Sequence, residues 1–543
     1  MQGLMMDSPL LVSGIVEHAD QNYPDREIVS VTSEDSLHRY TYKDCFKRVR
    51  KLANALEKLN IAKGDRIATL AWNDYRHLET YYAVGGSGYV CHTINPRLFP
   101  EQIVFMINHA EDKWIMTDPL FLPLLESISD QIPDVEGYIV FSNEETMPKT
   151  TLKNAVSYES LINDESDEYK WPVLDERAAI GLCYTSGTTG DPKGTLYNHR
   201  STILHAYALI APDVMNLSNR DCILPVVPLF HVNSWGSPYG AMIVGSKIVY
   251  PGPKMGDGET LYSLIESEGV TLALGVPTVW LLLLQYAESE GKKLNSLQRT
   301  IIGGAAVPES MIREFRDKHD VFVHQAWGMT EMSPLGTAVA LKAGMEDLSA
   351  DELVTLQAKA GRSMFGVEMR IVDDDQNILP WDGEAFGALQ VKGPWVCSDY
   401  FKLEGSAGSH TDDGWFDTGD VAKIDPQGYM QITDRTKDVI KSGGEWISSI
   451  EIENTAIGHP AIAEAAVIGV AHEKWTERPL LIAVKSKDKD VTKEEILSWF
   501  DGKIAKWWLP DDVVFIDEIP HTATGKIKKT ALREQFVDYK LPD

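Results

Sequence analysis

A run rich in glycine and hydroxyl side chains, beginning at Tyr184, is the part of the sequence best equipped to bind a polyphosphate. It reads Tyr-Thr-Ser-Gly-Thr-Thr-Gly-Asp-Pro-Lys-Gly and follows the apolar stretch 180–184. Glycines let several backbone N–H groups point at one anion, while the hydroxyls and Lys193 add donors and positive charge. Pro192 stands where a Walker A loop has glycine, so this is a different kind of phosphate loop. A flexible surface loop is the alternative, and the density of glycine, hydroxyl and lysine argues against it.

Three further runs carry side chains suited to nucleotide chemistry. The run Gln-Ala-Trp-Gly-Met-Thr-Glu ends at Glu331, an oxygen ligand for Mg²⁺, and contains Trp327, a flat face for adenine, and Thr330, a hydroxyl for phosphate. Gly303 opens a Gly-Gly-Ala-Ala run whose small side chains let a ligand reach the backbone. Asp420 could accept both hydroxyls of a ribose. Core packing, a solvated carboxylate or a turn would explain each residue singly, but their occurrence in one chain favours a nucleotide site.

Together these runs resemble the motifs of the adenylate-forming superfamily, which contains acyl-CoA synthetases, luciferases and peptide-synthetase adenylation domains. The resemblance extends from about residue 30 to 535, with at least six motifs in the family order. It implies an α/β fold: a large N-terminal domain of layered α/β subdomains with a β-rich subdomain, then a small mobile α+β C-terminal domain. The implied reaction joins ATP and a carboxylic acid into an acyl-adenylate with release of pyrophosphate, and CoA then converts the acyl-adenylate to acyl-CoA and AMP. Mg²⁺ is the implied cofactor, with ATP and CoA as cosubstrates.

The resemblance also implies roles for individual residues. Lys526, Lys193 and His231 are the implied catalytic residues, Thr185 and Glu331 the metal ligands, and Lys437 the hinge. The implied ATP and AMP contacts are Thr185, Ser186, Gly187, Thr188, Thr189, Gly190, Lys193, Gly303, Gly304, Ala305, Ala306, Gln325, Ala326, Trp327, Gly328, Met329, Thr330, Asp420, Ile432, Arg435, Lys441 and Lys526. The implied acyl contacts are His231, Val232, Trp235, Gly236, Gly303 and Gly328, and the CoA contacts are Lys441, Ser442, Gly443, Gly444, Glu445 and Trp446. Taken alone, His231 is better explained as a core histidine and Lys526 as a surface charge.

The segments 92–103, 225–236 and 275–286 most resemble bacterial fatty acyl-CoA synthetases, and among these the 3-(methylthio)propionate–CoA ligases of dimethylsulfoniopropionate breakdown. This implies a short- or medium-chain acid, with 3-(methylthio)propionate favoured and a medium- or long-chain fatty acid as the alternative. Trp235 resembles the aromatic gate of such synthetases, with a static core aromatic as the alternative. They often pair, which implies a homodimer. The rival functions are transfer to a carrier protein or oxidation after adenylation, and a non-catalytic nucleotide binder.

The elements that must position these residues follow from periodicity and length. At 543 residues the chain needs several structural units. A helix beginning near Thr41, followed by short apolar strands such as 223–227 and 272–276, indicates α/β layers. After about residue 360, strands separated by turns indicate a mostly antiparallel unit. Helices from about 449 and over 493–504, with strands near 465–470, 480–484 and 513–516, indicate a compact final domain. We therefore expect an N-terminal adenylation domain over 1–435 and a C-terminal domain over 436–543.

The whole-chain composition limits the partners. The formal charge is −29, from 51 basic and 80 acidic residues, so the surface repels nucleic acid and anionic lipid. Any anion site must therefore be built locally. The five cysteines are odd in number, widely spaced and without a Cys-x-x-Cys pair, which argues against disulfides or zinc. With no basic N-terminal region and no apolar stretch long enough for a membrane span, we expect a cytoplasmic protein.

Overall fold

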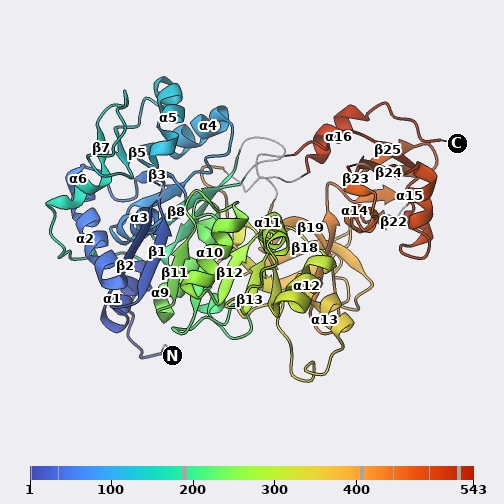
Figure 1. Ribbon diagram of the computed structural model, residues 1–543, viewed down its shortest axis with the longest axis horizontal. Coiled ribbons are helices and arrows are strands. Elements are labelled where there is room, and N and C mark those ends of the chain that lie inside the picture. Colours follow the sequence, from blue (N-terminus) through green and yellow to red (C-terminus); the bar gives the residue numbers. More distant parts are fainter. Residues whose placement is uncertain are drawn as a thin grey trace. The chain divides into compact units, whose positions relative to one another are not determined.

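The computed structural model describes residues 1, 3–34, 36–185, 192–403, 409–443, 445–487, 489–521 and 527–542 (Figure 1). The chain divides into two compact units. Within the described residues, the first unit contains residues up to 185, 192–368 and 393–403, and the second contains 369–392 and residues from 409 onward. None of the helices in these ranges is long and apolar enough to cross a membrane.

The first unit contains a seven-stranded sheet in the order β7-β6-β5-β3-β4-β8-β9. Its strands are parallel except for β9, and most are buried on both faces, as parallel sheets require. The strands are β3 (Arg66–Leu70), β4 (Val90–Thr93), β5 (Asp112–Thr117), β6 (Gly137–Val140), β7 (Ala155–Ser157), β8 (Ala179–Tyr184) and β9 (Gly194–Asn198). Its helices are α2 (Tyr42–Lys58), α3 (Tyr75–Gly86), α4 (Pro100–Ala110), α5 (Leu122–Ile128), α6 (Tyr158–Asn163) and α7 (His199–Leu209).

Helix α2 begins where the sequence predicted. Thr41 caps it, and Asp44 accepts a hydrogen bond from the Thr41 backbone, completing a capping box.

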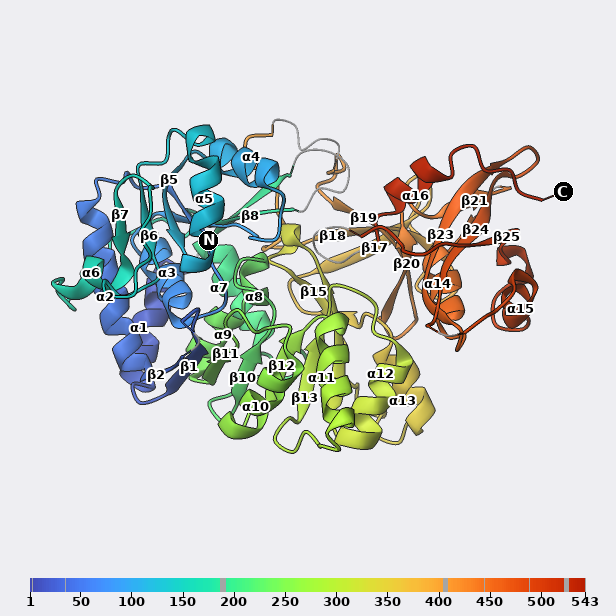
Figure 2. The same cartoon turned by 45° about the horizontal axis from the view of Figure 1, so that its top comes forward.

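A nine-stranded sheet forms the other layer of the first unit, in the order β16-β15-β14-β13-β12-β10-β11-β1-β2. Its strands are β1 (Glu27–Val31), β2 (Leu37–Thr41), β10 (Cys222–Pro225), β11 (Lys247–Tyr250), β12 (Leu272–Gly275), β13 (Arg299–Ile302), β14 (Phe322–Gly328), β15 (Leu335–Ala338) and β16 (Arg362–Ser363). The helices are α1 (Val12–Asn22), α8 (Val232–Trp235), α9 (Ser237–Val244), α10 (Gly258–Glu268), α11 (Pro277–Ser289), α12 (Glu309–Glu314) and α13 (Ala350–Gln357) (Figure 2). Trp280 of α11 and Phe315, which directly follows α12, are both fully buried and pack edge to face in the core.

The second unit contains two sheets. The first has the order β17 (Glu368–Val372), β18 (Phe386–Lys392), β19 (Phe416–Ile424), β20 (Met430–Arg435), and β18, β19 and β20 pair antiparallel, as predicted. The second sheet contains β21 (Ile440–Ser442), β22 (Glu445–Ile447), β23 (Ile462–His472), β24 (Thr476–Lys485) and β25 (Asp512–Phe515). Its helices are α14 (Ser449–Ile457), α15 (Lys493–Trp499) and α16 (Lys529–Gln535).

The structure of this unit bears on two sequence predictions, the length of helix α15 and the domain boundary. The helix predicted over 493–504 was too long, because α15 ends at Trp499 and Gly502 then turns the chain with a φ of +73°. The second unit joins the β17–β20 sheet to the C-terminal elements. The predicted domain boundary at residue 435 concerns movement between half-reactions and stays a prediction.

Candidate functional site

The strand pair β8–β9 positions the two ends of the predicted phosphate loop. The backbone N–H of Thr185 donates to the carbonyl of Lys193 at 2.9 Å, and the N–H of Lys193 donates to Oγ1 of Thr185 at 3.3 Å. These two bonds fix the Thr185 hydroxyl and the Lys193 backbone side by side at the base of the loop. The loop residues themselves, Ser186, Gly187, Thr188, Thr189 and Gly190, lie outside the described residues.

Tyr400 links the base of this loop to Glu331. The ammonium group of Lys193 lies 4.9 Å from the centre of the Tyr400 ring, and the Tyr400 hydroxyl donates to Oε1 of Glu331 at 2.7 Å. The hydroxyl of Tyr197, on β9, donates to the carbonyl of Thr330 at 2.7 Å. The structure therefore brings the cation of one motif to the carboxylate of another. Sequence reasoning missed Tyr400, because its neighbours in the sequence match none of the motifs considered.

The residues predicted to hold Mg²⁺ suit that ion. Glu331 supplies a buried carboxylate, 7% exposed, and Thr185 supplies a hydroxyl. In the described part of the chain, no three His, Cys, Asp or Glu side chains gather as a metal site. Mg²⁺ in nucleotide enzymes commonly takes one or two carboxylates and completes its octahedron with phosphate oxygens and water. One carboxylate and one hydroxyl are ligands that fit an ion that arrives with a triphosphate.

The adenine and acyl motifs meet at the ends of β13 and β14. The Gln325 side chain accepts a hydrogen bond from the backbone of Val307 at 3.1 Å, which fastens the 303–306 turn to β14. A Cβ atom on Gly303 would lie 2.9 Å from the carbonyl of Ala326 and 3.2 Å from Cη2 of Trp235. Gly303 therefore allows the Trp235 ring and β14 to approach its backbone, and a side chain there would not fit without movement.

The other predicted residues of this region lie along the same two segments. Gly304, with a φ of +80°, and Ala305 and Ala306 are exposed at the turn. Trp327 is half-buried near the end of β14, opposite Thr337. A Cβ on Gly328 would lie 2.2 Å from the carbonyl of Pro334, and the N–H of Met329 donates to that carbonyl.

The short element α8, Val232–Trp235, is a left-handed turn that the sequence did not reveal, and it contains the predicted acyl residues Val232 and Trp235. Val232, Asn233, Ser234 and Trp235 have φ angles of +46°, +53°, +49° and +55°, and Gly236 follows at +73°. Each non-glycine residue in this conformation costs about 1–2 kcal/mol, and a β-branched residue such as Val232 rarely adopts it. Strain of this kind is characteristic of functional sites, where surrounding contacts hold the backbone in place.

Two of the side chains with predicted acyl roles lie just before this turn and near its end. His231 directly precedes Val232 and is exposed, and Trp235 is buried, at 8% exposure.

In the second unit, Asp420 and Arg435 form one pair. They are partners on β19 and β20, and Nε of Arg435 lies 2.7 Å from Oδ1 of Asp420, whose side chain is 5% exposed. Ile432 lies on the same strand as Arg435, opposite Ala422.

The predicted CoA residues gather on the hairpin of β21 and β22. The ammonium of Lys441 lies 2.9 Å from Asp374 and 4.8 Å from the centre of the Trp446 ring. Arg478 donates to the Ser442 hydroxyl at 3.3 Å. Gly443 turns the hairpin with a φ of +61°, and a Cβ there would lie 2.9 Å from the Trp475 ring.

The remaining predicted residues of the second unit can be placed only in part. Lys437 is exposed between β20 and β21. Glu445 is described as the first residue of β22, without its side chain, while Gly444 and Lys526 lie outside the described residues.

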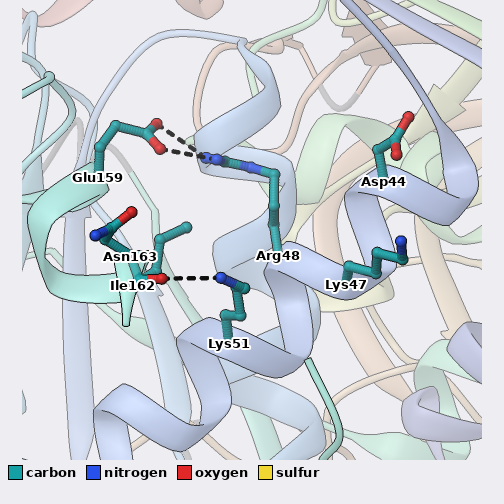
Figure 3. Close-up of a pocket in the computed structure, with 7 residues that line it drawn as sticks. All are labelled: Asp44, Lys47, Arg48, Lys51, Glu159, Ile162 and Asn163. Carbon is teal, nitrogen blue, oxygen red and sulfur yellow. Dashed lines mark hydrogen bonds and ion pairs between the residues drawn. The ribbon is translucent and has the colours of Figure 1, made fainter. Parts of the chain in front are cut away.

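A cavity of about 300 Å³ lies apart from these residues, between α2 and α6. It is lined by Asp44, Lys47, Arg48, Lys51, Glu159, Ile162 and Asn163, and Figure 3 shows Arg48 directed at Glu159. The guanidinium binds both carboxylate oxygens, at 2.8 and 2.9 Å. Burial would raise the pKa of Glu159, but Arg48 and Arg76 lower it to about 2. The cavity contains none of the predicted site residues, and the charge of Arg48 is already neutralised.

Comparisons with known proteins agree with the predicted motifs. The model of the AMP-binding enzyme family matches residues 16–401, and that of the AMP-binding enzyme C-terminal domain matches residues 451–526. The chain is 52% identical to 3-methylmercaptopropionyl-CoA ligase of Ruegeria lacuscaerulensis, over 99% of both chains. It is 51% identical to medium-chain-fatty-acid–CoA ligase of Ectopseudomonas oleovorans, over 100% of this chain and 98% of that one.

A solved structure supports the predicted fold class. The o-succinylbenzoate coenzyme A synthetase of Bacillus subtilis, in complex with ATP and magnesium ion, matches with a TM-score of 0.79 and 24% identity, over 96% of this chain and 99% of that one. The likeness confirms a large α/β domain with several sheets followed by a small C-terminal domain.

Proposed function

Because the chain belongs to the AMP-binding enzyme family and is an AMP-forming acid–CoA ligase that uses ATP, we propose that its acid is short or medium in chain length, with 3-(methylthio)propionate favoured. The observation that carries this proposal is the 52% identity, over 99% of both chains, to a 3-methylmercaptopropionyl-CoA ligase. The 51% identity to a medium-chain-fatty-acid ligase supports the alternative of a medium- or long-chain fatty acid.

The Trp235–Gly303 contact supports a small acid. Cη2 of Trp235 lies 3.2 Å from the position that a Cβ of Gly303 would occupy, so the ring closes against the glycine backbone. A long acyl chain passing between them would have to displace a ring that is 8% exposed and fixed in a left-handed turn.

A panel of acids from acetate to palmitate tests the substrate. We expect the highest kcat/KM for CoA thioester formation with 3-(methylthio)propionate and unsubstituted acids of similar length. An optimum at octanoate would favour the alternative, and an optimum at palmitate would refute the proposal. Release of AMP should depend on CoA, and its independence from CoA would point to a carrier protein or an oxidation instead.

We propose that the first half-reaction depends on cancelling negative charge. An acid carboxylate must attack the α-phosphorus of ATP while the bond to the β-phosphate breaks and pyrophosphate leaves, and both reactants are anions on a chain of net charge −29. Lys193 and Lys526 supply positive charge, and Thr185 and Glu331 hold Mg²⁺, which would polarise the phosphate oxygens. Asp420 holds the ribose hydroxyls, with its carboxylate oriented by Arg435 at 2.7 Å. Thr330 and the loop amides then complete the phosphate site.

The second half-reaction is proposed to use the β21–β22 hairpin. Rotation about Lys437 would exchange Lys526 for residues 441–446, so one small domain would serve both steps. Asp374 pairs with Lys441, and the centre of the Trp446 ring lies 4.8 Å from that ammonium, so the hairpin presents an aromatic face and one cation for the CoA side. A homodimer is proposed from resemblance alone, and sedimentation of the purified protein tests it.

A further inference from the structure

We propose that Tyr81 is a positioning residue that holds the left-handed turn 232–236, and through it His231 and Trp235, in the geometry that binds the acid. The inference rests on the proposed acyl site. Tyr81 lies on α3, which belongs to the layer of the seven-stranded sheet, whereas the turn follows β10 of the nine-stranded sheet. Helix α3 therefore couples one layer of the first unit to the acyl residues of the other.

The Tyr81 hydroxyl contacts both the turn and the segment that enters it. The side chain is 2% exposed, and its hydroxyl donates to the carbonyl of Leu229, two residues before His231. The same hydroxyl lies 3.2 Å from Oδ1 of Asn233, inside the left-handed turn. A single proton shared by these two oxygens ties the entry of the turn to its second residue.

Asn73, just before α3, fixes the segment that enters the turn. Its side-chain amide donates to the carbonyls of Pro225 and Val227 at 3.0 and 2.8 Å, and its oxygen accepts from the N–H of Leu229 at 2.6 Å. The residue is fully buried, so these bonds have no competition from water. Asn73 and Tyr81 together bind three carbonyls and one N–H of residues 225–229.

These contacts explain how the strained backbone persists. Val232, Asn233, Ser234 and Trp235 all adopt a conformation that L-residues avoid, and no glycine precedes Gly236 in the turn. Such a backbone is stable only where outside contacts determine it. The Ser234 hydroxyl contributes one such bond, to the carbonyl of Val227 at 2.8 Å, and the Tyr81 hydroxyl contributes the bonds from α3.

The neighbouring residue on the same helix provides a matched control. Tyr82 is also fully buried, and its hydroxyl donates to the carbonyl of Pro238 at 3.0 Å. Pro238 lies in α9, beyond the turn. Tyr81→Phe and Tyr82→Phe therefore each delete one hydroxyl from one helix, but only Tyr81→Phe releases the left-handed turn.

The test measures thioester formation by the full-length wild type and both variants with 3-(methylthio)propionate, butyrate and octanoate, varying acid and ATP separately. For the best acid, we expect Tyr81→Phe to raise KM about tenfold, with KM for ATP changed less than twofold. We expect Tyr82→Phe to lower the melting temperature about as much as Tyr81→Phe does, but to change KM for the acid less than twofold. Asn233→Gly removes the acceptor of the Tyr81 contact, together with a longer one from Cys183 Sγ at 3.6 Å. Glycine adopts the left-handed conformation freely, and the loss of Oδ1 should raise KM for the acid.

Two results would overturn the inference. An unchanged KM for the acid in both Tyr81→Phe and Asn233→Gly, with lowered melting temperatures, would make Tyr81 purely structural. An equal rise of KM in Tyr82→Phe would show that α3 acts through packing in general. Failure of the proposed function looks different, because the wild type itself would then turn over none of the three acids.

Discussion

Replacing Tyr400 with phenylalanine isolates one hydrogen bond at the candidate magnesium site. The hydroxyl donates to Oε1 of Glu331 at 2.7 Å, and Glu331 is 7% exposed, so water cannot fully replace the lost donor. The ring stays in place beneath Lys193, whose ammonium lies 4.9 Å from its centre. The substitution therefore changes the orientation of the carboxylate and leaves the cation with its aromatic partner.

The size of the effect follows from the charge on Glu331. A hydrogen bond to a charged group contributes about 1.5–3 kcal/mol, which converts to a roughly 10- to 150-fold fall in kcat/KM for ATP. Tyr400→Leu also removes the ring, and the lost cation–π contact of about 0.5–2 kcal/mol should lower kcat/KM by a further factor of about 2 to 30. Both losses should weaken the step that uses magnesium and ATP, without changing KM for CoA.

Acid-dependent exchange between ATP and pyrophosphate, measured over a series of Mg²⁺ concentrations, is the appropriate assay. We expect Tyr400→Phe to need more Mg²⁺ for half-maximal exchange. Tyr158→Phe is the matched control, because Tyr158 donates to the buried Glu79 at 2.6 Å, and neither residue belongs to the candidate site. If Tyr400→Phe shows wild-type dependence on both ATP and Mg²⁺, then Tyr400 does not position Glu331 for the metal.

Three further predictions follow from other parts of the chain. Lys526→Ala should abolish ATP–pyrophosphate exchange yet still convert supplied acyl-adenylate to acyl-CoA, and wild-type exchange would contradict the role of that lysine. Gly303→Ala should raise KM for the acid and lower the melting temperature, because the new Cβ would lie 2.9 Å from a backbone oxygen and 3.2 Å from Trp235. An unchanged KM would argue that Gly303 and Trp235 do not border the acid. Burial and the neighbouring Asp118 raise the pKa of Asp74 to about 8, so the folded state holds that proton more tightly than the unfolded state, and stability should fall as pH rises toward and through 8. Asp74→Asn keeps the helix cap but has no carboxyl group to titrate. Between pH 6 and 8.5, the free energy of unfolding should therefore fall less in the variant than in the wild type, by at least about 1 kcal/mol, as measured by denaturant titration at each pH.

The regular elements were largely predictable because local chemistry determines them. The cap at Thr41 and the apolar face behind it indicate α2, and the apolar runs near 465–470, 480–484 and 513–516 correspond to β23, β24 and β25. The strand predicted over 223–227 ends instead at Pro225. The N–H groups of Val226 and Val227 both donate to the carbonyl of Leu274, and the Asn73 side chain donates to the carbonyls of residues 225 and 227. A residue 152 positions away in the chain thus ends the strand, which no local pattern could show.

The candidate site was predictable only as motifs. A run rich in glycine and hydroxyl side chains indicates a phosphate site from its composition alone, because it supplies backbone N–H groups and hydroxyl donors close together. The residues that arrange them have no such signature: Tyr400 and Tyr81 are ordinary aromatic residues until the fold places their hydroxyls against Glu331 and Leu229. The left-handed turn was also invisible, because its first residue, Val232, is β-branched and argues against that conformation.

The aromatic partner of Lys193 leaves positive charge available on a strongly acidic chain, as the proposed phosphate role of this lysine requires. Within the described residues, its ammonium lies over the Tyr400 ring, and no carboxylate forms an ion pair with it, whereas Lys441 pairs with Asp374. An aromatic face attracts a cation without cancelling its charge, so Lys193 can still meet a triphosphate at full charge. Because the same tyrosine directs its hydroxyl to Glu331, one residue contacts both the cation proposed for phosphate and the carboxylate proposed for metal.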